Sequence, residues 1–69
     1  MFWVKEYSEV NTFIGANPVS ERLDAYEMAI KIAKSSFRYT FTVIVIEVDF
    51  DSIGNILEIE LMKLNTQDR

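Results

Sequence analysis

Strand-forming residues in an alternating pattern dominate the first part of the chain. The stretch FWVKEY, which begins at Phe2, is rich in aromatic and β-branched residues, and its side chains alternate between two faces if it is extended. A weak turn signal at Ser8 and Glu9 precedes a second short strand, expected over about residues 10–14, although one longer bent strand would also fit. The pattern therefore predicts a β segment over residues 2–15.

The middle of the chain has the period of an amphipathic helix, which is expected over about residues 18–37. It has two candidate starts: Asn17 and Pro18 as N-cap and first helical residue, or Ser20 followed by Glu21. Apolar residues form a main stripe and a flank beside it, and together they are wider than one sheet face needs. The stripe comprises Leu23, Tyr26, Ile30, Ala33 and Phe37, and the flank comprises Ala25, Met28 and Ile32, of which Met28 and Ile32 are candidates for a secondary partner-binding surface.

The strongest strand signal is YTFTVIVIEVDF, from Tyr39 to Phe50, and the alternating residues after it predict a β-hairpin over residues 39–64. The loop is expected at residues 51–54, with Gly54 suited to a positive φ. This register puts the large apolar residues of both strands on one core face. The expected cross-strand pairs are Val48 with Leu57, Ile46 with Ile59, and Ile44 with Leu61.

These elements predict a small single α+β domain over residues 1–69, with the order ββαββ and an antiparallel sheet that carries one amphipathic helix on one face. A helix about 10 Å wide covers about two strands spaced near 4.8 Å, so part of the sheet must face something else. If the helix packs against Ile44, Ile46 and Val48, the face turned away from it is also apolar, which favours burial by a second copy or another protein. That face would comprise Tyr39, Phe41, Val43, Val45, Ile56, Met62 and Leu64.

The same register gathers acidic side chains at the turn end of the face turned away from the helix. Like charges opposite one another cost stability, so the cluster needs an explanation. It is typical of a solvated sheet end or of charges that protect an edge from aggregation, and its functional interpretation is a partner that bears Lys or Arg. The predicted partner-binding residues are therefore Tyr39, Phe41, Val43, Val45, Glu47, Asp49, Glu58, Glu60 and Met62.

Residues 49–60, DFDSIGNILEIE, carry part of a helix-flanked calcium loop, because Asp49, Asp51 and Glu60 occupy its positions one, three and twelve. Position five of such a loop is Asp or Asn, whereas here it is Ile53, and both flanks alternate with the period of strands. The hairpin is therefore preferred, and no metal or cofactor is predicted. A divalent-cation or small-ligand module that uses these three carboxylates is the alternative hypothesis.

Composition removes most catalytic chemistry. The 69 residues include no Cys and no His, so the commonest nucleophile, the commonest general base and the usual transition-metal ligands are missing, and we expect that the protein is not an enzyme. A domain of this size buries only about 60% of the surface that its unfolded chain exposes. Because no disulfide or zinc site can compensate, we expect a homo-oligomer.

Charge disfavours nucleic acid as a partner, since eleven acidic and seven basic residues give a net charge of -4. The hypothesis of a weak nucleic-acid binder rests on Lys31, Lys34 and Arg38, whose place near the end of the helix is explained as well by the helix dipole. No apolar stretch is long enough to span a membrane and no secretory signal is evident, so a cytoplasmic location is expected.

The function expected from these features is that of a small non-catalytic protein-interaction module. It would form a homodimer and bind one protein partner through an apolar sheet face with an acidic rim. In size, acidity and low glycine content the chain is similar to the compact proteins that bacteriophages use to bind and inhibit host enzymes or CRISPR complexes. The similarity covers general build and no motif, and it implies an inhibitor of a host protein complex.

Overall fold

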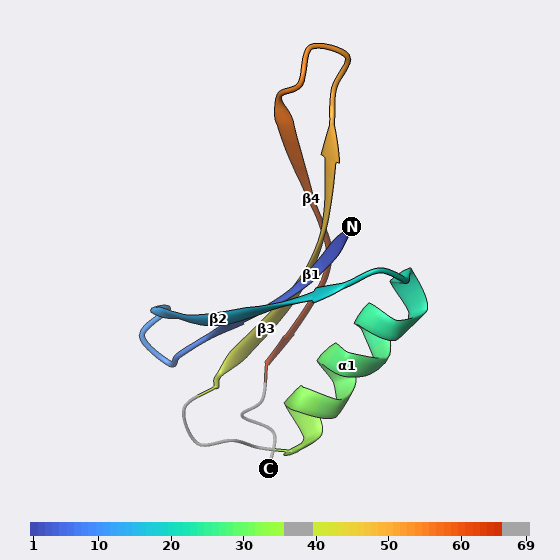
Figure 1. Cartoon of the computed structure of the whole chain (residues 1–69). Coiled ribbons are helices and arrows are strands. Elements are labelled where there is room, and N and C mark those ends of the chain that lie inside the picture. The colour runs from blue at the N-terminus through green and yellow to red at the C-terminus, as the bar shows by residue number, and fades with distance from the viewer. Residues whose placement is uncertain (36–39, 66–69) are drawn as a thin grey trace.

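The computed structural model describes residues 1–35 and 40–65 and confirms the α+β fold with the order ββαββ (Figure 1). Four antiparallel strands form one sheet in the order β2-β1-β3-β4, and one helix packs on one face of it. The N-terminal strand β1 therefore pairs with the hairpin of its own chain. The elements are β1 (Phe2–Tyr7), β2 (Phe13–Val19), α1 (Arg22–Ser35), β3 (Thr42–Phe50) and β4 (Ile56–Asn65).

The second strand extends further than predicted, and the helix begins later. Asn17 and Pro18 lie in β2 opposite β1, and the helix begins at Arg22, where the C=O of Glu21 accepts the N–H of Ala25 at 3.1 Å. The first of the two candidate starts is therefore wrong. Proline is tolerated in an edge strand because its missing N–H can face away from the neighbouring strand, and β2 is an edge of this sheet.

Strands β3 and β4 form the predicted hairpin, but their register is one residue away from the expected one near the turn. Cross-strand partners share a face, so a slip of one residue moves every side chain of one strand to the other face. The slip places Leu57 and Ile59 of β4 on the face opposite to Ile46 and Val48 of β3. The observed pairs are Val48 with Glu58 and Ile46 with Glu60, in place of Leu57 and Ile59.

A β-bulge then changes the register again. Ile46 pairs with Glu60 whereas Val45 pairs with Met62, which leaves Leu61 as the extra residue on β4. After the bulge, Ile44 pairs with Lys63 and not with the expected Leu61. The alternation of β4 is thus reversed between its first and second halves.

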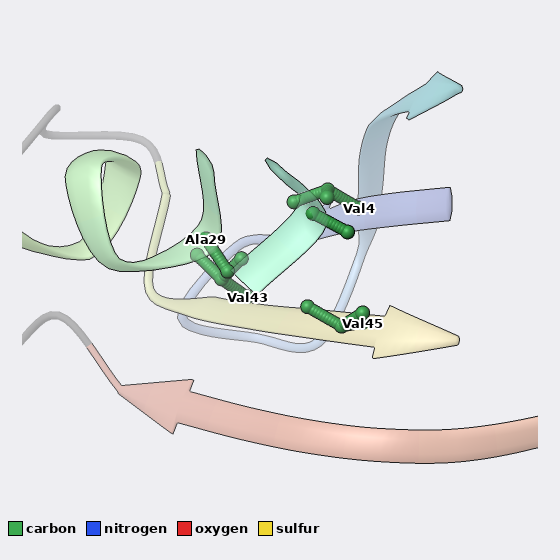
Figure 2. Packing of buried hydrophobic residues seen from close by; sticks show 5 residues of the cluster. Val4, Ala29, Val43 and Val45 are labelled. Atoms are coloured by element: carbon green, nitrogen blue, oxygen red, sulfur yellow. The ribbon is translucent and has the colours of Figure 1, made fainter. Parts of the chain in front are cut away.

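The helix covers the face of the sheet that was expected to be free. Val43 and Val45 are fully buried under α1, together with Val4 of β1 and two alanines of the helix, Ala25 and Ala29 (Figure 2). Small side chains at positions four residues apart let the helix lie close to the sheet. The expected assignment of the two sheet faces is therefore wrong.

The helix also presents a different side to the sheet than predicted. Leu23 is 73% exposed and Ile30 is 40% exposed, although both were assigned to the main core stripe. The flank residues Met28 and Ile32 instead pack against the core, as does Tyr26. The last residue of the predicted stripe, Phe37, lies outside the described residues.

The hairpin extends well past the rest of the sheet (Figure 1). Strand β1 accompanies β3 only as far as Glu47, and the last contact is the N–H of Val48 with the C=O of Met1 at 2.8 Å. Residues 49–57, called the arm below, continue as two strands and a loop. The radius of gyration is 12.5 Å, above the value of about 11 Å expected for a compact chain of this length, because the arm projects from the body.

Candidate functional site

The sheet face away from the helix is apolar and has no element of the described chain packed on it. We call it the open face. Because Val4, Val43 and Val45 point towards α1, the residues that alternate with them point the other way. The open face comprises Trp3, Ala16, Ile44, Ile46, Val48, Phe50 and Ile56.

Exposure on the open face increases from its centre towards the arm. Ile46, which has paired strands on both sides, is only 7% exposed, whereas Phe50 is 62% exposed and Ile56 is 63% exposed. Phe50 and Ile56 are cross-strand partners, so they form one apolar pair on the arm. A shallow hollow of about 320 Å³ lies on this face, lined by Trp3, Lys5, Ala16, Ile46, Val48, Ile56 and Glu58.

Charged residues cross and border this apolar surface. Lys5 Nζ lies 3.9 Å from Glu58 Oε1, and this ion pair spans from β1 to β4 over β3. Glu58 and Glu60 lie on the open face because they pair with Val48 and Ile46, and Lys63 follows on the same face after the bulge. The open face therefore has an acidic border on β4 that ends in one lysine.

The predicted acidic cluster is divided between the two faces of the sheet. Glu47 pairs with Ile59 and Asp49 with Leu57, so these two acids lie on the helix side, opposite to Glu58. The Oε1 atom of Glu47 contacts Nη2 of Arg22, at the start of α1, at 3.4 Å. The expectation that four carboxylates share one face is wrong because it depended on the register.

Several other predicted partner-binding residues are placed in the core. Val43 and Val45 are fully buried, and Met62 packs against them beneath α1. Phe41 is half-buried, and its N–H donates to the C=O of Tyr7 at 2.8 Å. Tyr39 lies outside the described residues.

The open face includes three residues that the sequence pattern assigned to the core, namely Ile44, Ile46 and Val48. One signal in the chain distinguishes the two faces. On β4, Glu58 and Glu60 alternate with apolar residues, which indicates that their side of the strand is not covered. Ala25 and Ala29, four residues apart on the helix, mark the side that can approach a sheet most closely.

The carboxylate of Asp51 organises the hairpin loop. Its Oδ1 atom accepts the N–H of Asn55 at 2.8 Å and the N–H of Ile53 at 3.0 Å. These bonds, that of Asn55 above all, lower the pKa of Asp51 below its ordinary value of 3.8, against an opposing effect of burial. Gly54 has the predicted positive φ, at 91°. The loop geometry is therefore that of a hairpin turn.

The calcium hypothesis finds no support in this geometry. Among the described residues, no three acidic side chains are grouped so that they could hold a metal ion. Asp49 Oδ1 accepts the N–H of Phe50 at 2.8 Å, while Glu60 lies on the other face of the hairpin. Asp49, Asp51 and Glu60 are therefore not brought together as ligands.

Two basic residues of the nucleic-acid hypothesis, Lys31 and Lys34, are exposed on the helix. Lys31 and Lys34 line a shallow hollow of about 500 Å³ together with Glu27 and Ile30. Arg38 lies outside the described residues. Because Glu27 contributes a negative charge to the same hollow, this part of the surface is of mixed sign.

No helix in the described part of the chain is long and apolar enough to cross a membrane. Compared with protein-family models, with curated proteins and with solved structures, the chain matches none of them.

Proposed function

We propose that this chain is a non-catalytic protein-interaction module that binds a protein partner through its open face. The observation that carries the proposal is the row of large apolar side chains from Trp3 to Ile56 on a sheet face that no described element covers. Contiguous apolar patches on small proteins are typical of binding surfaces. The lack of Cys and His in the whole sequence supports a function without catalysis.

The open face has the composition of a binding surface, with an apolar centre and a charged border. Phe50 and Ile56 are each more than half exposed, and burial of such a side chain is worth about 1.5–3 kcal/mol. Specific interfaces bury about 800 Å² on each partner, which is about one sixth of the 4892 Å² surface of this chain. The border formed by Glu58 and Glu60 favours a partner with Lys or Arg around an apolar centre.

A narrower form of the proposal is an inhibitor that acts in the cytosol on a protein complex of a host cell. It is supported by the small size, acidity and build that the chain shares with bacteriophage inhibitors. Such an inhibitor needs no catalytic group, because occupation of a functional surface of its target is sufficient.

The proposal is tested by partner capture with matched surface variants. Ile56→Glu places a charge on the open face, whereas Val10→Glu places the same charge in the β1–β2 turn, where Val10 is 81% exposed. Tagged wild type and both variants are cross-linked in an extract of the cells in which the chain is made, and captured proteins are identified by mass spectrometry. The proposal requires a partner that the wild type and Val10→Glu retain and Ile56→Glu loses.

Circular dichroism of both variants shows whether they are folded before the capture is compared. A partner that binds all three proteins equally would show that another surface is used, and the open face would then not be the binding site. Binding of the identified partner to the purified proteins, measured by calorimetry, gives the affinity that each variant retains.

A further inference from the structure

The outer edge of β4 is a long unpaired edge in the described part of the sheet. β4 pairs with β3 on one side, and the sheet order places no described strand on its other side. Along its ten residues, Ile56–Asn65, about every second residue therefore presents a backbone N–H and C=O that another strand can pair with. The opposite edge, β2, is shorter and contains Pro18, which removes a donor.

We propose that β4 pairs antiparallel with β4 of a second copy of this chain, so that the two four-stranded sheets join into one. This inference goes beyond the proposed function, which concerns a protein partner on the open face. It uses a different surface, because the contact is at the strand edge and leaves the open faces of both copies side by side.

Complete overlap of the two strands defines one register. When all ten residues of β4 are paired with the same ten residues of a second copy, Ile56 lies opposite Asn65. This register has the largest number of backbone hydrogen bonds available to the pair, and twofold symmetry makes every cross-strand contact occur twice.

Charges are complementary in this register. Glu58 lies opposite Lys63 of the second copy, and both residues are on the open face of their own sheet. The symmetric contact sets Lys63 opposite the other Glu58. Opposite charges directly across a ladder stabilise strand pairing. A register displaced by three residues towards the arm would instead set Glu58 opposite Glu60, so the charges favour complete overlap.

Apolar contacts on the helix side also match. In the same register Leu57 lies opposite Leu64 of the second copy, and Ile59 lies opposite Met62. All four positions belong to the helix-side face of β4, and Leu57 and Ile59 are both exposed in the single chain. The pairing would cover the exposed apolar surface of Leu57 and Ile59.

The bulge at Leu61 makes the register compatible with the two faces of the sheet. Without it, complete overlap of a ten-residue strand would set residues of opposite faces against each other, as in Glu58 against Lys63. The extra residue reverses the alternation in the second half of β4, so that these two residues share a face. The bulges of the two copies then meet at the centre of the pair, where Glu60 lies opposite Leu61.

Charge reversal tests the pairing. Sedimentation equilibrium at micromolar concentrations is expected to show a dimer for the wild type. Lys63→Glu and Glu58→Lys each create two like-charge contacts, and each is expected to weaken the dimer at least about tenfold. The double variant Glu58→Lys/Lys63→Glu restores both contacts and is expected to recover the wild-type dissociation constant. An equimolar mixture of the two single variants is expected to form a heterodimer.

A control separates the proposed contact of Glu58 with Lys63 of the second copy from the ion pair that Glu58 makes with Lys5 in its own chain. Lys5→Ala removes that internal partner, which lies 3.9 Å from Glu58, and is expected to leave the dimer dissociation constant unchanged. The inference is overturned if the wild type is still monomeric at about 100 times the micromolar concentrations used first. It is also overturned if the double variant and the mixture dimerise as weakly as the single variants do. Circular dichroism confirms that each variant is folded.

The two proposals fail in different ways. A monomer that still captures a partner through the open face would refute the β4 pairing and leave the proposed function standing. A dimer that obeys the charge reversal, but shows no capture that depends on Ile56, would support the pairing and refute the proposed function.

Discussion

Replacement of Val45 by alanine tests the assignment of the two sheet faces, on which the location of the open face depends. Val45 is 0% exposed and belongs to one buried cluster with Val4 and two alanines of α1 (Figure 2). If the face of Val45 were free of the helix, as the sequence pattern predicts, its truncation would cost little. Because Val45 belongs to the buried cluster beneath α1, its truncation opens a cavity in the core.

The expected loss follows from the atoms that are removed. Truncation of valine to alanine deletes two methyl groups, each worth about 0.8 kcal/mol of transfer free energy, and the cavity that remains adds to this. We expect the free energy of unfolding to fall by about 2–3 kcal/mol. A domain of 69 residues has a total stability of about 3–10 kcal/mol, so a large part of it would be lost.

Urea unfolding followed by far-ultraviolet circular dichroism measures the change, at one fixed protein concentration because self-association would add to stability. The matched control is Val10→Ala, the same truncation at a residue that is 81% exposed, for which we expect a change below about 0.5 kcal/mol. The melting temperature of Val45→Ala should fall by about 10–20 °C. Equal, small effects of the two truncations would refute the burial of Val45 and with it the position of the open face.

Two further predictions concern the hairpin loop. The pKa of Asp51 is depressed in the folded state, so this carboxylate stabilises the fold above pH 3.8, and the stabilisation is lost as the pH falls through the folded-state pKa. In Asp51→Asn, the melting temperature should therefore depend less on pH in this acidic range. An equal pH dependence in wild type and variant would contradict the role of this carboxylate. A Cβ added at Gly54 meets no atom within 4 Å, but the alanine of Gly54→Ala must adopt a φ of 91°. We therefore expect the free energy of unfolding, measured in urea, to fall by about 1–2 kcal/mol. An unchanged stability would argue against this turn geometry.

The order of elements could be predicted from the chain because each has a local cause. Alternation and β-branched residues produce the strands, the spacing of apolar residues produces the helix, and Gly54 permits the positive φ of the hairpin loop. These signals act over a few residues and do not depend on what packs against them. The α+β class with the order ββαββ follows from them.

The identity of the covered face could not be predicted, because β3 is apolar on both sides over Val43, Ile44, Val45 and Ile46. Hydrophobicity alone favours large residues for the core, so Leu23 and Ile30 were assigned to the main helix stripe. In the folded chain, the side of the helix that carries Ala25 and Ala29 packs against the sheet, since a helix approaches a sheet closely where its side chains are small. Close packing is a property of two surfaces together, and neither surface shows it alone.

The residues of the candidate site depend on the register of β3 with β4, because a slip of one residue moves side chains from one face of the sheet to the other. A slip of one position near the turn and the bulge at Leu61 put Glu58 and Glu60 on the open face and moved Glu47 and Asp49 to the other side. The sequence by itself determined that this chain has an apolar sheet face with acidic residues beside it. Only the tertiary structure decided which residues form that face, because cross-strand partners are chosen by the packing of the whole sheet against the helix and not by the pattern along either strand.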